Sequence, residues 1–102
     1  MILIMGEVRF GAGEMDRLRE DMQRMIAATR EEDGCEAYAF AEDVAEPDLL
    51  RISERWRDEG AIDAHMQAPH TQAFLGRIGE ARVEEMSIRL YRGEFLRNLL
   101  GD

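Results

Sequence analysis

The stretch ERWRDEGAIDAHMQAPHTQAF, residues 54–74, contains the change of pattern that decides the fold. It begins inside a segment, residues 49–57, in which apolar and charged side chains alternate as they do in a half-buried strand. From Asp58 onward the apolar side chains recur with helical spacing, which Pro69 interrupts. The sequence therefore predicts a strand followed by a helix that is bent or built in two pieces.

The segments on either side extend this pattern to the rest of the chain. Residues 1–10 are predicted to form a strand, residues 14–33 a helix that ends at Gly34, residues 35–42 a strand, and residues 83–92 a last strand. The order strand, helix, strand, strand, helix, strand indicates an α+β fold. It is the ferredoxin-like split βαβ arrangement, with both helices on one face of an antiparallel sheet.

The other face of such a sheet has no cover within one chain. Leu3, Met5, Leu49 and Tyr91 add apolar area to that face, and a short apolar tail, residues 95–100, follows the last strand. A chain of this length buries only about two thirds of its unfolded surface, so burial against a partner would help. We expect a homodimer in which a second sheet covers the first.

The composition excludes several classes of partner. The formal charge of −9 arises from 22 acidic and 13 basic side chains, and no basic cluster stands apart from compensating acids. Nucleic acid and anionic membranes would be repelled. The apolar opening, residues 1–5, is too short to span a membrane and lacks the basic start of a signal peptide. We expect one cytoplasmic domain, residues 1–102, with no internal disulfide because Cys35 is the only cysteine.

The quoted stretch resembles the E-x-W, A-h-x-A-H and s-P-H-x-x-x-F signature of antibiotic biosynthesis monooxygenase (ABM) domains. Residues 31–38, EEDGCEAY, resemble the G-C-x-x-Y junction of the same family. The resemblance implies a dimeric α/β barrel made of two ferredoxin-like sheets, with a pocket between sheet and helices in each subunit. Family members include cofactor-free oxygenases of phenolic compounds, isomerases and haem-degrading enzymes, so the function must be argued from the site.

Oxygenation without a cofactor requires a substrate anion and therefore a base. His65 is the candidate, because imidazole readily accepts protons near neutral pH and the family-like motif surrounds it. We expect this ring to border a dry hollow that an aromatic molecule can enter. The alternative is a structural histidine whose nitrogens bond backbone groups at the boundary between helix and sheet.

Glu54 is a second candidate catalytic residue. It stands between Ile52 and Trp56 on the apolar face of its strand, where an unpaired carboxylate costs several kcal/mol. The carboxylate must therefore have a partner. An orienting hydrogen bond to His65 is one interpretation, and a structural pair with an arginine or a helix-terminal amide is the other.

Further side chains are candidates for binding the substrate. Four aromatic residues could wall a pocket for a planar ring or simply belong to the core: Tyr38, Phe40, Trp56 and Phe74. Arg89 could stabilise a phenolate or a peroxide anion, or it could pair with Glu85 or with an acidic residue across the dimer.

No metal or other cofactor is predicted. His70 completes the family-like Pro-His pair and is a candidate binding residue, but five residues turn it about 140° away from His65 on an uninterrupted helix. A metal shared by the two rings is therefore not expected. The chain has no zinc-binding H-E-x-x-H, no nucleotide-binding glycine motif, and no asparagine on the first strand of the kind known in the haem-degrading relatives.

These observations predict a cofactor-independent monooxygenase that oxidises a quinol or polyphenolic aromatic with O₂, using His65 as general base. Two alternatives stay open. One is an isomerase that uses the same acid–base pocket and consumes no oxygen. The other is a non-catalytic dimer that binds a ligand.

Overall fold

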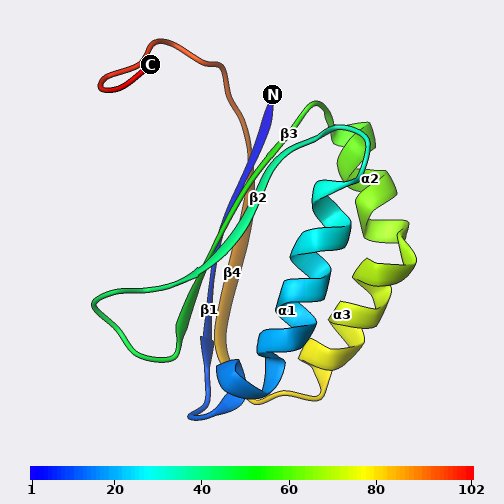
Figure 1. Cartoon of the computed structure of the whole chain (residues 1–102), viewed down its shortest axis with the longest axis vertical. Coiled ribbons are helices and arrows are strands. Elements are labelled where there is room, and N and C mark those ends of the chain that lie inside the picture. Colours follow the sequence, from blue (N-terminus) through cyan, green and yellow to red (C-terminus); the bar gives the residue numbers. More distant parts are fainter.

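The structure, a computed structural model, describes all 102 residues as an antiparallel sheet with helices on one face (Figure 1). The elements in chain order are β1 (Ile2–Phe10), α1 (Glu14–Arg30), β2 (Cys35–Glu42), β3 (Leu49–Trp56), α2 (Glu59–Gln67), α3 (Pro69–Gly79) and β4 (Val83–Arg92). The four strands lie in the order β2-β3-β1-β4, and all neighbours are antiparallel. This is the predicted ferredoxin-like split βαβ arrangement.

The predicted interruption of the second helical segment separates two helices, α2 and α3. Ala68 between them is extended, with φ −65° and ψ 142°, because the ring of a following proline disfavours helical geometry in the residue before it. Pro69 is the first residue of α3, a position where its missing N–H has no intrahelical partner to lose. The chain therefore changes direction between His65 and His70.

The first helix ends three residues earlier than the sequence predicts, at Arg30 rather than near Asp33. A turn follows, in which Gly34 adopts a left-handed conformation with φ 88°. The carbonyl of Gly34 accepts a hydrogen bond of 2.8 Å from the backbone N–H of Arg57, which ties the turn to the end of β3. The early exit from the helix places Glu32 in this turn instead of on α1.

Gly34→Ala is expected to lower the free energy of unfolding by about 2 kcal/mol or more. A methyl group at this position would lie 2.6 Å from Cβ of Ala61, and the positive φ is unfavourable for alanine. Urea unfolding followed by tryptophan fluorescence measures the loss. Gly76→Ala is the matched control: a methyl group there meets nothing within 4 Å, and alanine favours the helix by about 0.5–1 kcal/mol. Equal stabilities for the two variants would contradict this account.

The core fills the space between the sheet and the helices. One cluster lies towards α2 and contains Ile2, Ile4, Met25, Tyr38, Trp56, Ala61 and Ile62. A second cluster lies towards the start of α1 and contains Val8, Phe10, Met15, Leu18, Met22 and Leu50. Phe40 and Phe74 pack against both clusters and so join them into one continuous core.

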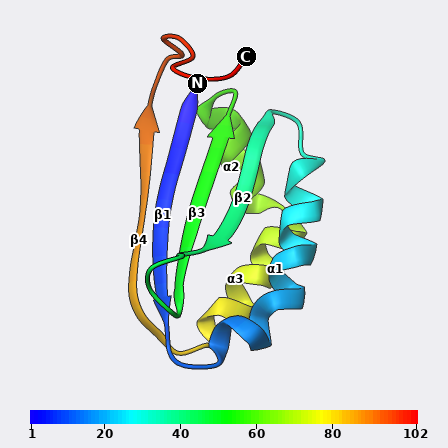
Figure 2. The ribbon, with the colours of Figure 1, turned by 60° about the vertical axis from the view of Figure 1, so that its left-hand side comes forward.

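The last strand, β4, is the least covered part of the sheet. Figure 2 shows it at the sheet edge farthest from β2, beyond the area over which the helices lie. Met86, Ile88 and Leu90 are each at least half exposed, as is Met5 on the outer face. Leu49, by contrast, is buried beside the turn of residues 43–48, so the prediction that it adds apolar area to the outer face is wrong.

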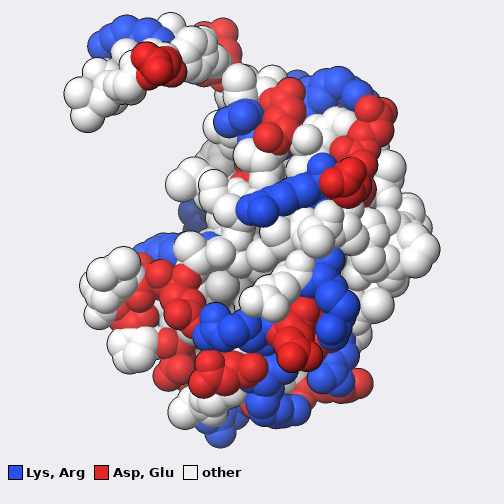
Figure 3. Space-filling view, viewed as in Figure 1, with Lys and Arg blue, Asp and Glu red and all other residues white.

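Charged side chains of both signs are interspersed over the face seen in Figure 3. Along α1, for example, Arg19 pairs with Asp16 and Glu42, and Arg24 pairs with Asp21. This pairing leaves no extended surface of one sign on that face. None of the helices combines the length and the apolar character that crossing a bilayer requires.

Candidate functional site

The two histidines of the chain meet at one carboxylate. Oε2 of Glu32 lies 2.6 Å from Nδ1 of His65 and 2.7 Å from Nε2 of His70. The three side chains come from the turn after α1, the last turn of α2 and the first turn of α3. The prediction that His70 points away from His65 is wrong, because it assumed an uninterrupted helix and Pro69 starts a new one.

The shared carboxylate determines which nitrogen of His65 is available. An ionised carboxylate only accepts hydrogen bonds, so Nδ1 of His65 donates to it and Nε2 keeps a free lone pair. Nε2 forms no hydrogen bond, although the His65 side chain is only 5% exposed. No fully buried side-chain nitrogen or oxygen lacks a partner, so Nε2 retains contact with accessible space.

Two of the four predicted aromatic residues lie beside His65. The ring centres of Trp56 and Tyr38 lie 4.8 Å and 5.6 Å from that of His65. The ring centres of Tyr38 and Phe40 lie 5.2 Å apart, and those of Phe40 and Phe74 lie 5.8 Å apart. Burial raises the pKa of the Tyr38 phenol, which therefore stays protonated and does not compete with His65 as a base. We call these four rings the aromatic cluster.

Glu54 has a different partner from either of those predicted. Its Oε1 accepts a hydrogen bond of 2.8 Å from the indole N–H of Trp56, which lies two residues along the same face of β3. Glu54 makes no hydrogen bond to His65, so the predicted orienting bond is wrong. Burial raises the pKa of Glu54 above its ordinary value, and the hydrogen bond from Trp56 offsets this only in part.

The carboxylate that bonds to His65 is Glu32, which the sequence analysis did not single out. Its signal was present in the family-like stretch of residues 31–38, just before the glycine of the junction. The sequence predicts a helix that reaches residue 33, and this helix would place Glu32 in its last turn. The turn that brings Glu32 to His65 was therefore not expected. Thr71 was also missed: its hydroxyl oxygen lies 3.4 Å from Nδ1 of His65.

Glu54→Gln is expected to raise the free energy of unfolding at pH 7 by roughly 1 kcal/mol. A raised pKa means that the folded state favours the protonated carboxyl. The protonated Glu54 carboxyl therefore stabilises the folded wild type at low pH, and this stability is lost as the pH rises from about 4.5 through the folded-state pKa. Glutamine stays neutral over the whole range. Urea unfolding across this pH range measures the difference. Glu20→Gln, at an exposed glutamate, should show no such pH trend, and a pH-independent difference for Glu54→Gln would contradict the assignment.

The hollow nearest to the site borders His70 rather than His65. A groove of about 280 Å³ lies between α1 and α3, and Met25, His70 and Phe74 are among its lining residues. None of the five main hollows is lined by His65, so the expected hollow beside that ring is not found. Phe74 is one of the four rings of the aromatic cluster, and Met25 belongs to the same core cluster as Tyr38 and Trp56, so the groove adjoins the aromatic cluster.

Arg89 is separated from this group by the sheet. It is exposed on the outer face, where it lines a hollow of about 380 Å³ together with Met5 and Tyr91. The suggested pair with Glu85 is also absent, since Glu85 lies 3.8 Å from Arg9 instead. Arg89 therefore has no contact with His65.

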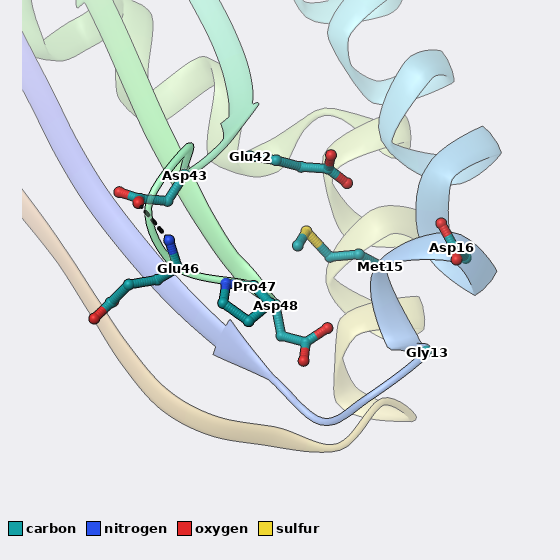
Figure 4. A pocket seen from close by; sticks show the side chains of 8 residues that line it. All are labelled: Gly13, Met15, Asp16, Glu42, Asp43, Glu46, Pro47 and Asp48. Atoms are coloured by element: carbon teal, nitrogen blue, oxygen red, sulfur yellow. Dashed lines mark hydrogen bonds between the residues drawn. The ribbon is translucent and has the colours of Figure 1, made fainter.

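An acidic hollow of about 250 Å³ lies at the start of α1, beside the turn between β2 and β3 (Figure 4). Three of its carboxylates already have arginine partners: Glu42 pairs with Arg19, Asp43 with Arg51, and Glu46 with Arg9. Asp43 also accepts hydrogen bonds from the backbone N–H groups of Ala45 and Glu46. These acids hold the turn together and contribute nothing to the histidine site.

The fold and the buried site define a ferredoxin-like domain with an imidazole–carboxylate centre set among aromatic rings. The model of the antibiotic biosynthesis monooxygenase family matches residues 1–77, and the chain belongs to that family. An Escherichia coli protein named "Probable quinol monooxygenase YgiN" is 27% identical in a match that covers 88% of this chain and 95% of that protein.

The chain is also similar to two further proteins. The crystal structure of a Deinococcus radiodurans protein described as a "putative antibiotic biosynthesis monooxygenase" superposes with a TM-score of 0.90 and 28% identity, over 99% of this chain and all of the other. An uncharacterised Synechocystis protein is 26% identical over 89% of this chain. This chain spans only 62% of that relative's length.

Proposed function

We propose that the protein is a monooxygenase that oxidises a quinol-like aromatic compound with O₂, without a metal or flavin, and that Nε2 of His65 is the general base. The observation that carries this proposal is the buried His65 ring, whose Nδ1 is held by Glu32 while Nε2 has no partner. The name of the Escherichia coli relative supports the substrate class.

In the first step, Nε2 accepts a proton from the substrate hydroxyl or from an acidic carbon in conjugation with it. Glu32 holds the ring and stabilises the imidazolium that forms, as the acidic member of a catalytic triad does. The low exposure of His65 and Trp56 keeps water from competing for the anion. Glu32 is thus a positioning residue, and His65 is the residue that meets the substrate.

In the second step, the substrate anion gives one electron to O₂, and the resulting radical pair combines at a ring carbon that bears hydrogen. The resulting peroxide anion takes back the proton that His65 removed in the first step and becomes a hydroperoxide. His65 then removes the proton on that ring carbon, the C–H electron pair forms the carbonyl group as the O–O bond breaks, and the expelled hydroxide takes this proton from His65 and leaves as water. One oxygen atom stays in the product as a carbonyl group and the other becomes water.

The substrate is proposed to arrive through the groove between α1 and α3. Phe74 lines this groove and also contacts Phe40 of the aromatic cluster. His65 does not line the groove, so a substrate hydroxyl reaches Nε2 only after side chains between the groove and His65 move. Arg24 and Arg77 border the same groove, and both pair with Asp21, which also lines it.

Oxygen consumption and isotope labelling test this proposal. A naphthohydroquinone is added to the protein in air, and the rate above the protein-free background is measured with an oxygen electrode. With ¹⁸O₂ we expect one labelled oxygen atom in the product and no hydrogen peroxide released. Turnover that continues without oxygen would contradict the proposal and indicate the isomerase alternative.

We also propose that two copies of the chain associate through the outer face of the sheet. That face has no helix over it (Figure 1), and Met5 and Tyr91 on it are 63% and 45% exposed. The tail beyond β4 carries four more exposed apolar side chains: Phe95, Leu96, Leu99 and Leu100. Light scattering should give twice the 11.7 kDa mass of one chain. A monomer at micromolar concentration would contradict this assembly.

A further inference from the structure

We infer that Glu32, His65 and His70 form a binding site for one divalent transition-metal ion, with Zn²⁺ as the representative probe. The three side chains each offer one donor atom, and all of these atoms lie within 4.8 Å of one another. They come from three separate segments, which the end of α1 and the break at Pro69 bring together. Two imidazole nitrogens and one carboxylate oxygen are a common donor set for such ions.

The spacing of the donor atoms suits a shared ion. Zinc holds histidine nitrogens and carboxylate oxygens about 2.0–2.2 Å away, so two tetrahedral ligands lie roughly 3.3 Å apart. The donor atoms here are separated by 2.6 Å at the closest and by no more than 4.8 Å. This range includes the separation that a shared ion requires.

The Glu32 carboxylate offsets part of the charge of a dication. Binding replaces the two protons that now lie between the imidazole nitrogens and Glu32. With Glu32 as a ligand, one of the two positive charges of a Zn²⁺ ion is neutralised, which lowers the free-energy cost of its burial.

The groove between α1 and α3 gives the ion a route to the site. The His70 side chain is 28% exposed and lines this groove, whereas His65 and Glu32 are 5% and 15% exposed. Three protein ligands leave a fourth position for water on the groove side. Zinc sites with an open position are built in this way.

Occupation of the site has a consequence that rests on the proposed function. A ring that ligates a metal through Nδ1 carries its proton on Nε2, so it cannot accept another from the substrate. The metal-free protein is then the form in which His65 acts as a base.

Zinc affinity of the whole, metal-stripped protein tests the site without any measurement of turnover. Zn²⁺ is titrated in competition with a chromophoric chelator, and we expect one ion per chain. The protein has only two histidines, so His65→Gln and His70→Gln should each weaken binding by about tenfold or more. Co²⁺ should give visible absorption bands that disappear in His70→Gln. Cys35→Ser is the control for thiolate binding and should keep the wild-type affinity.

Unchanged affinity in His70→Gln, or weakened affinity in Cys35→Ser, would overturn the inference. His70 lies near the groove surface, and circular dichroism shows directly whether its variant is folded. Oxygen consumption measured in excess chelator tests the proposed function separately. If the protein binds zinc but does not turn over a quinol, the metal site is supported and the oxygenase proposal is contradicted. If it turns over a quinol but does not bind zinc, the oxygenase proposal is supported and the metal site is contradicted.

Discussion

His65→Gln is expected to lower kcat/KM for a quinol substrate by about 10²- to 10⁴-fold, the usual contribution of a general base. Glutamine can keep a hydrogen bond to Glu32, so the fold is retained, but it offers no nitrogen that accepts a proton. The rate of oxygen consumption in the presence of a chelator measures the loss. The remaining turnover reflects binding alone.

His70→Gln is the matched control for this prediction. Both rings donate to Oε2 of Glu32, but only His65 lies among Trp56 and Tyr38. We expect His70→Gln to change kcat/KM by less than about tenfold. If His65→Gln stayed within threefold of the wild type while His70→Gln lost activity, the base would be His70, which faces the groove.

Trp56→Ala is expected to lower the free energy of unfolding by about 3–5 kcal/mol. The indole is fully buried, and its N–H is the only hydrogen-bond donor to the Glu54 carboxylate. Truncation leaves a cavity next to His65 and a buried carboxylate without a partner, and both effects act in the same direction. The free energy of unfolding of a small domain is only about 5–15 kcal/mol, so this variant should be only marginally stable.

Urea unfolding followed by far-ultraviolet circular dichroism measures this loss, since Trp56 is the only tryptophan of the chain. Trp56→Phe fills most of the cavity but lacks the N–H, and so isolates the hydrogen bond. Glu54→Gln keeps an oxygen that can accept the indole N–H, so a double-mutant cycle of the two variants measures only the part of the coupling that depends on the negative charge of Glu54. A loss below 1 kcal/mol for Trp56→Ala would show that the indole is not a packing centre.

The fold could be predicted from the sequence because each element carries a strong local signal. Alternating side chains in residues 49–57 identify β3, and Pro69 identifies the gap between α2 and α3. The end of α1 was misplaced because residues 31–33 are compatible with a helix, and only a tertiary bond, from Arg57 to Gly34, requires the turn. Local propensity carries no information about such a bond.

The candidate site was predictable only in part. The aromatic cluster follows from residues that share one face of a strand or helix, and such periodicity is visible in a sequence. Glu32 is 33 residues from His65, and its role depends on where a helix stops. Arg89 was grouped with the site although it lies two residues from Tyr91, which the sequence analysis places on the face without helices, and side chains two apart on a strand share a face.

The extended residue between α2 and α3 has a consequence for protein engineering. On an unbroken helix, two histidines five positions apart diverge and cannot share an oxygen atom. Their convergence on one carboxylate therefore depends on the Ala68–Pro69 junction as well as on the two histidines. Anyone transplanting this histidine pair into a designed scaffold must transplant the junction with it.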